Sequence, residues 1–170
     1  MIKIIDIGTG SGCIAISLSK NLPNAQVFAL DVSENALATA KENALLNNVD
    51  VNFLHQDIFQ VENFSEKFDV IVSNPPYVRN LEKHEIRPNV SEYEPHLALF
   101  VENKNPLIFY EKIAELASKN LKQSGVLYFE INQYLGTETS EMLQKKLSPA
   151  SIELRKDLFG NDRMIKAVIG

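Results

Sequence analysis

The hexapeptide SNPPYV at residues 73–78 places an amide side chain before two consecutive prolines, directly after the apolar run FDVIV. Proline donates no backbone hydrogen bond and biases the preceding residue away from helix, so Asn74 is held extended and the backbone beyond it is stiff. The segment is either a strand end or a rigid fixture that presents two acceptors, the side-chain oxygen of Asn74 and the carbonyl of Pro75. Such acceptors can hold both hydrogens of a planar NH2 group, such as a carboxamide or a base amine, on which Tyr77 can stack.

A second stretch with chemical potential is the glycine turn DIGTGSG at residues 6–12. Glycines let the backbone turn sharply and approach a ligand closely, and in parallel sheets such turns lie at the carboxyl edge, where nucleotides bind. Structural turns between strand and helix use glycine as well. The spacing of Gly8, Gly10 and Gly12 after Asp6 nevertheless resembles the S-adenosylmethionine (SAM) turn of class I methyltransferases. In that turn Asp6 would orient the loop and, through water, the amino group of the ligand.

Two further carboxylates end the next two apolar segments. Asp31 ends AQVFALD, where an acidic side chain can accept hydrogen bonds from both ribose hydroxyls, and Val32 beside it belongs to the same expected cofactor site. Asp57 ends VNFLHQD and can accept from an adenine amino group while Ile58 packs on the ring. Either aspartate could instead be a cap or a loop residue, but their positions at successive strand ends favour one site. Asn74 at the fourth strand end would face the methyl group of SAM and is the last expected cofactor contact.

The remaining residues of chemical interest show no such pattern. His55 has no partner at metal-ligand spacing, so a structural role and no metal site are expected. Cys13, the single cysteine, excludes an internal disulfide framework and fits a reducing cytoplasm. We expect Cys13 to be a small core residue on the first helix.

The composition narrows the possible functions. With 170 residues, 45% apolar and 23% charged, the chain is typical of one globular domain. Its net charge of −5, without a cluster of basic residues longer than Lys145 and Lys146, disfavours a nonspecific nucleic-acid binder. The sequence contains neither an apolar run of membrane-spanning length nor a signal-peptide pattern, so no membrane partner is expected.

Short apolar runs alternate with helix-patterned stretches, which predicts an α/β fold around a mostly parallel sheet. Strands are expected at 2–6, 25–31, 51–57, 67–73 and 126–131, with a hairpin of 151–157 and 163–169. Helices are expected at 12–22, 34–48, 106–122 and 137–147. The second helix would be capped by Ser33 and carry an apolar stripe of Ala36, Leu37, Ala40, Ala44 and Leu45. Together these elements predict a Rossmann-like class I methyltransferase fold with a seven-stranded sheet, helices on both faces and a C-terminal antiparallel hairpin.

Residues 79–105 interrupt this alternation, because they are polar, contain prolines and lack clear periodicity. Loops beyond about 15 residues in compact domains are usually functional lids or disordered segments. Because this stretch directly follows the two prolines, we expect a lid over the substrate site, with a solvated insertion as the alternative.

The order of motifs carries a more specific resemblance. NPPY is similar to the motif of amino-methyltransferases that act on glutamine, adenine or guanine. DIGTGSGCIAISL, SNPPYV, EPHLALF, FYEKIAELA, LYFEI and KDLFGNDR then follow in an order that resembles the HemK-type protein-(glutamine N5) methyltransferases of peptide-chain release factors. The resemblance implies transfer of a methyl group from SAM to a glutamine side-chain amide of a release factor, a cytoplasmic step of translation termination.

The resemblance also assigns residues. It implies SAM contacts at Gly8, Asp31 and Asp57, and contacts to the substrate amide at Asn74, Pro75 and Tyr77. Glu94 and Pro95 match the family's lid motif and Glu130 its fifth-strand acid, with structural roles expected for all three.

Two departures from the family pattern are visible. VENKN replaces the family's glycine-rich segment after the lid motif. The family's N-terminal helical domain, which recruits the release factor, is absent from this sequence, so residues 1–170 are expected to form a methyltransferase domain alone. Methylation of adenine or guanine in DNA or RNA is the alternative activity, which the acidic balance disfavours. A non-catalytic SAM-binding or protein-interaction domain is the alternative outside enzymes.

Overall fold

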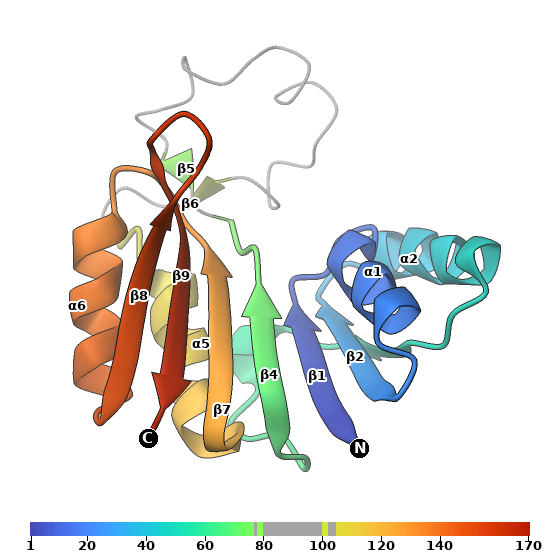
Figure 1. Ribbon diagram of the computed structural model, residues 1–170. Coiled ribbons are helices and arrows are strands. Elements are labelled where there is room, and N and C mark those ends of the chain that lie inside the picture. The colour runs from blue at the N-terminus through green and yellow to red at the C-terminus, as the bar shows by residue number, and fades with distance from the viewer. Residues whose placement is uncertain (77, 80–99, 102–104) are drawn as a thin grey trace.

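A mostly parallel, seven-stranded sheet forms the centre of the computed structural model, which describes residues 1–76, 78–79, 100–101 and 105–170 (Figure 1). The strands lie in the order β3-β2-β1-β4-β7-β9-β8. Their bounds are Ile2–Ile7 for β1, Ala25–Asp31 for β2, Asn52–His55 for β3, Phe68–Ser73 for β4, Leu121–Glu130 for β7, Ala150–Lys156 for β8 and Asp162–Ile169 for β9. β1, β2, β3, β4 and β7 run parallel, whereas β9 is antiparallel to both β7 and β8. The predicted fold class is confirmed.

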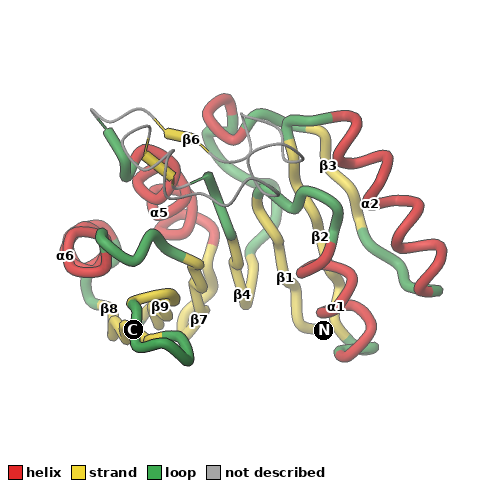
Figure 2. The backbone as a smooth tube through the Cα atoms, turned by 90° about the horizontal axis from the view of Figure 1, so that it is seen from above, coloured by secondary structure: helices red, strands yellow, loops and turns green. Residues whose placement is uncertain are grey.

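Helices cover both faces of this sheet, as expected for alternating strands and helices. The helices are α1 (Cys13–Asn21), α2 (Glu34–Asn47), α5 (Ile108–Asn120) and α6 (Gly136–Lys146), with a 3-10 turn η1 (Ile58–Gln60). Figure 2 shows α1 on one side of the sheet and α5 and α6 on the other. None of the helices in the described ranges is both long and apolar enough to span a membrane.

The larger core lies between the sheet and the pair α5 and α6. Tyr110, Ile113 and Leu143 from these helices are fully buried against strand residues such as Ile71 and Phe129. A smaller cluster on the other face joins α1 to β2 and consists of Ala15, Val27 and Ala29. The sheet is therefore held from both sides, which fixes the positions of its strand ends.

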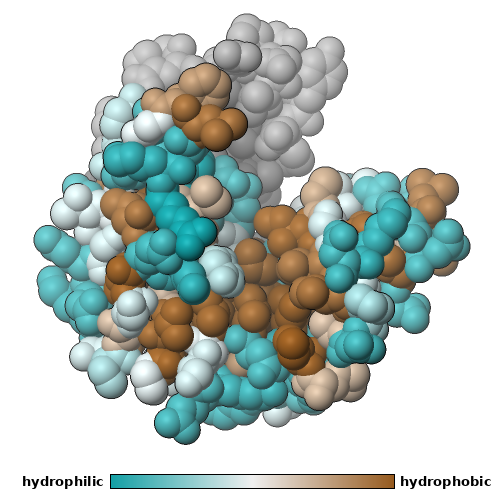
Figure 3. All heavy atoms as spheres, viewed as in Figure 1, coloured by the Kyte–Doolittle hydropathy of each residue, from teal (hydrophilic) through white to brown (hydrophobic). Residues whose placement is uncertain are grey.

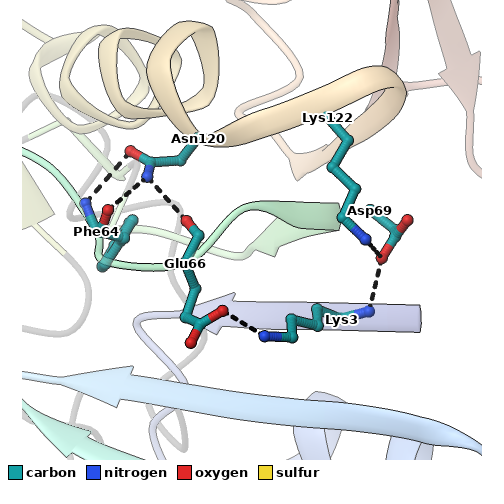
Figure 4. Close-up of polar contacts among 6 residues, drawn as sticks. All are labelled: Lys3, Phe64, Glu66, Asp69, Asn120 and Lys122. Carbon is teal, nitrogen blue, oxygen red and sulfur yellow. Dashed lines mark hydrogen bonds and ion pairs between the residues drawn. The ribbon is translucent and has the colours of Figure 1, made fainter. Parts of the chain in front are cut away.

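Polar contacts hold the strands together at the amino edge of the sheet, where the parallel strands begin (Figure 4). Asn120, at the end of α5, is buried and donates to the carbonyls of Phe64 and Glu66, both at 3.0 Å. Asp69 accepts hydrogen bonds from the backbone of Lys3 and the side chain of Lys122, both at 2.7 Å. These contacts anchor the loop before β4. They all lie at the amino edge and involve no residue of the carboxyl edge.

Three expectations about this frame were wrong in detail. β7 begins at Leu121, directly after α5, and not at 126. Leu45 is exposed, because the buried face of α2 is centred on Leu37, Ala40 and Ala44. Cys13 is also exposed, since it is the first residue of α1 and lies beyond the part of the helix that covers the sheet.

The expected lid at 79–105 lies mostly outside the described residues, as do Tyr77, Glu94 and Pro95. At its borders, β5 (Val78–Arg79) pairs in parallel with β6 (Phe100–Val101).

Candidate active site

The strand register brings the predicted site residues to one edge of the sheet. Ile7 at the end of β1 pairs with Leu30 of β2 and with Ser73 of β4. Asp31 at the end of β2 pairs with His55 at the end of β3. These strand ends lie side by side at the carboxyl edge of the sheet. Asp6 and Asp31 belong to the ends of β1 and β2, and Gly8, Asp57 and Asn74 follow the ends of β1, β3 and β4.

The three glycines of the turn after β1 have positive φ angles, but they serve two different purposes. Gly8 (φ 72°) and Gly10 (φ 56°) border open space, because a Cβ built on either would meet nothing within 4 Å. A Cβ on Gly12 (φ 86°) would lie 2.9 Å from the side chain of Ile16 and 3.0 Å from that of Ala40. Gly12 therefore lets α1 pack against α2, whereas Gly8 and Gly10 form an open cradle.

Asp6 lies beneath this cradle and is fully buried. Its Oδ2 accepts hydrogen bonds from Thr9 Oγ1 at 2.6 Å and from the Ala15 backbone at 3.2 Å, so it orients the turn as expected. Its Oδ1 is also buried and finds no hydrogen-bond partner among the described residues. Burial raises the pKa of Asp6 to about 6, against the opposing effect of these hydrogen bonds. The orphaned oxygen is an acceptor that a ligand or a water molecule can satisfy.

Asp31 links the glycine turn to the end of β2. Its Oδ2 accepts from the Gly10 backbone at 2.8 Å, and its Oδ1 accepts from the Ser33 backbone at 2.9 Å. The helix cap is Ser33, whose side chain accepts from the Ala36 backbone at 3.2 Å. Because each carboxylate oxygen has two lone pairs, both oxygens of Asp31 can accept one more hydrogen bond, as the predicted contact with two ribose hydroxyls requires.

His55 positions the segment that follows Asp31, a role that sequence reasoning described only as structural. One ring nitrogen of His55, Nε2, lies 2.9 Å from the carbonyl oxygen of Val32. The other, Nδ1, lies 3.5 Å from the carboxylate of Glu34. The side chain of Val32 is left exposed beside the cradle. Within the described residues, His, Cys, Asp and Glu form no group of three that could hold a metal ion.

The third carboxylate, Asp57, precedes η1 and caps it. Its Oδ1 accepts from the Phe59 backbone at 2.9 Å. The side chain of Ile58 is buried in the main core, so little of it is left to pack on a ligand ring. Phe59 is partly exposed instead, with its ring centroid 4.9 Å from that of Phe109. This aromatic pair was missed, because it joins residues 50 positions apart in the sequence.

The proline motif is fixed to the glycine turn by a buried hydroxyl. Ser73 Oγ donates to the carbonyl oxygen of Ile7 at 2.6 Å, which ties the end of β4 to the end of β1. Asn74 follows with its side chain exposed, and Pro75 is buried. An acceptor amide thus stands open on a rigid support, next to the cradle.

Glu130 ends β7, the other neighbour of β4. Its carbonyl accepts from Tyr110 Oη at 3.2 Å, and Tyr110 packs edge-on against Phe129. These contacts anchor the strand end through the backbone of Glu130. The structural role expected of its side chain stays a prediction.

The site therefore combines an open glycine cradle, two aspartates with spare acceptors, one orphaned buried oxygen and a rigid exposed amide. Such a set suits a ligand with hydroxyl and amino groups on one side and a planar amide or amine on the other.

Comparisons with known proteins show which family the chain belongs to. Residues 1–90 match the family described as methyltransferase small domain. The chain is 66% identical over 97% of its length to a release factor glutamine methyltransferase of Flavobacterium psychrophilum, of which it covers 58%. It is 48% identical, again over 97% of its length, to one of Bacteroides thetaiotaomicron, of which it covers 59%.

Among solved structures, the T. thermophilus 16S rRNA N2 G1207 methyltransferase in complex with AdoMet and guanosine superposes with a TM-score of 0.70 at 17% identity. That match covers 99% of this chain and 37% of the other, and it supports the fold. The chain spans less than two thirds of the length of both named relatives. Since the family match extends over more than half of the 170 residues, the chain belongs to the methyltransferase small domain family.

Proposed function

We propose that this chain transfers a methyl group from SAM to the side-chain amide nitrogen of a glutamine in a peptide-chain release factor. The observation that carries the proposal is the exposed side chain of Asn74, held beside the open glycine cradle by the bond between Ser73 and Ile7. The names of the two relatives described above supply the substrate class.

The residues at the carboxyl edge fit SAM. Gly8 and Gly10 leave room for the methionine part of the molecule, and the orphaned oxygen of Asp6 suits its ammonium group, directly or through water. Asp31 has spare lone pairs for the ribose hydroxyls, and Asp57 is the proposed acceptor for the adenine amino group. When bound, SAM supplies an electrophilic methyl group.

The proline motif would hold the nitrogen that receives this methyl group. An amide nitrogen is a poor nucleophile because its lone pair is delocalised into the carbonyl. If Asn74 and the Pro75 carbonyl each accept one N–H, the nitrogen is fixed in direction and its pyramidal form is favoured. Tyr77 is proposed to stack on the planar amide. Methyl transfer leaves a cationic nitrogen that still carries both hydrogens. Both N–H groups are then strongly acidic, so one proton can leave to solvent without a dedicated base.

The buried environment of Pro75 gives the motif its stiffness. Because Pro75 is buried and Ser73 is bonded to β1, the acceptors need little reorganisation when the substrate arrives. Preorganised acceptors are worth more in catalysis than mobile ones, since no energy is spent on ordering them.

Methyl-labelled SAM offered with a release factor, with DNA and with RNA tests the proposal. Label in one glutamine of the release factor, located by mass spectrometry, is the expected result. Label in adenine or guanine would replace the proposal with nucleic-acid methylation. SAM binding by calorimetry without transfer to any of the three would indicate a binding domain.

A further inference from the structure

The hairpin between β8 and β9 ends in two adjacent apolar side chains that contact water. Leu158 and Phe159 are almost fully exposed, with relative accessibilities of 101% and 90%. Figure 3 shows apolar surface at this end of the molecule, over the loop that joins the two strands. Exposed apolar residues are common on proteins, so the position of this pair relative to the candidate active site decides whether it can bind substrate.

This tip, residues 157–161, is a turn that hydrogen bonds hold in one conformation. Asp157 Oδ1 accepts hydrogen bonds from the backbones of Phe159 at 2.9 Å and Asn161 at 3.0 Å. The Asp157 backbone donates to the Asn161 carbonyl at 2.8 Å, and Gly160 supplies the positive φ of 85° that closes the turn. The two apolar side chains therefore stand on a defined support.

Ionic contacts strengthen this support. Arg163 Nε lies 3.6 Å from Asp157 Oδ2, and Lys156 Nζ lies 2.7 Å from Asp162 Oδ1 across the hairpin. The backbone hydrogen bonds, that from Asn161 first, hold the pKa of Asp157 below its ordinary value, so its carboxylate stays ionised at neutral pH.

The strand register places the tip at the same edge as Asn74. Met164 of β9 pairs with Glu130 at the end of β7, and Ser73 at the end of β4 pairs with Phe129. The tip thus begins where the carboxyl ends of β4 and β7 stop, and Figure 1 shows it rising beyond the sheet at that end. Because β9 lies two strands from β4, the tip is displaced sideways from Asn74 by about 10 Å.

We propose that Leu158 and Phe159 dock the stretch of protein substrate that flanks the target glutamine. This inference rests on the proposed function, since only a polymeric substrate extends beyond the site. The tip projects about 10 Å past the strand ends, so the straight path from Asn74 to it is about 14 Å. An extended peptide covers that path in about four residues. The tip should therefore contact apolar substrate residues three to five positions from the glutamine.

The test uses L158S/F159S with a matched control. Leu45 and Leu46 on α2 form another adjacent exposed pair, 77% and 79% exposed. They lie near the end of α2, just before β3, and hence at the opposite edge of the sheet. L45S/L46S therefore removes the same kind of surface without touching the proposed docking site.

Two release factor peptides separate docking from chemistry: one with two residues on each side of the glutamine, and one with eight. L158S/F159S should lower kcat/KM for the long peptide about 10- to 100-fold, mainly through KM, as expected for lost burial of two large apolar groups. Its kcat/KM for the short peptide and its SAM affinity should match wild type. L45S/L46S should behave as wild type on both peptides.

Binding of the long peptide, measured by fluorescence anisotropy, keeps the test decisive if no methyl transfer occurs. Tight binding by wild type and weak binding by L158S/F159S would support docking even where the proposed function fails. Equal loss on both peptides would show that the tip shapes the site, and unchanged long-peptide kinetics and binding would exclude docking. A dimer in solution that L158S/F159S dissociates would assign the tip to a second copy of the chain and overturn the inference.

Discussion

Asp6→Asn should stabilise the fold at neutral pH, because it removes a charge that is buried beneath the glycine cradle. Asp6 is fully buried, and its pKa is raised from 3.8 to about 6. This difference corresponds to about 3 kcal/mol of folding free energy. Because the folded state binds the proton more tightly than the unfolded state, the cost is fully present above about pH 6. It is relieved as the pH falls from 6 toward 4.

The variant removes the charge but keeps the contacts that orient the turn. An asparagine carbonyl can accept from Thr9 Oγ1 and the Ala15 backbone as Oδ2 does now, and its NH2 group then occupies the place of the orphaned Oδ1. The stability advantage of Asp6→Asn over wild type, measured as the free energy of unfolding, should be smaller at pH 4 than at pH 7.5 by about 2.4 kcal/mol. Urea unfolding of both proteins without ligand, at half-unit pH steps, measures this difference.

Asp6→Asn should lower the affinity for SAM, although it raises the stability of the fold. If the ammonium group of SAM meets Oδ1, then Asp6→Asn replaces an anionic acceptor by a donor, and affinity should drop at neutral pH even though the fold is more stable. Wild-type affinity should weaken below pH 6, at most tenfold per pH unit, as Asp6 takes up its proton. A stability difference that is constant with pH, or equal SAM affinity of the two proteins, would refute the reasoning.

Three further substitutions test separate parts of the structure. Asn74→Ala should leave SAM affinity nearly intact and lower the single-turnover methylation rate by about 10² to 10³; a folded, fully active variant would end the catalytic assignment. Asp31→Ala should weaken SAM binding, measured by calorimetry, by about 1.5–3 kcal/mol; unchanged affinity would contradict the ribose contact. Asn120→Leu should destabilise the fold by about 2–3 kcal/mol, because the carbonyls of Phe64 and Glu66 lose their donor; an unchanged urea midpoint would show that water replaces the amide.

The order of strands and helices was predictable, because each apolar run and each helical stripe is a local signal. The convergence of Asp6, Asp31, Asp57 and Asn74 on one edge also followed from the sequence, since all four end strands that were expected to be parallel. This step needed no contact information, only the rule that parallel strands share a carboxyl edge.

Contacts between segments distant in sequence were not predictable. Leu45 continues a helical apolar stripe, yet it is exposed, because α2 packs on α1 through Ala40, which lies close to Gly12. His55 reaches the Val32 carbonyl only because β3 lies beside β2, and no spacing rule signals that bond. Ile58 was predicted to pack on the adenine ring, but it is buried in the core, whereas its neighbour Phe59 is partly exposed.

The central place of β1 has a consequence for synthesis on the ribosome. β1 leaves the ribosome before every other strand described here, yet it pairs with β4, whose residues lie 66 positions later. Until β4 emerges, one edge of β1 has unpaired backbone groups, which can attract another nascent chain. β7 stays open in the same way until β9 is made, because β9 covers its outer edge. Completion of this sheet therefore waits for β9, and a ribosome that stalls before residue 162 would present an exposed, aggregation-prone edge.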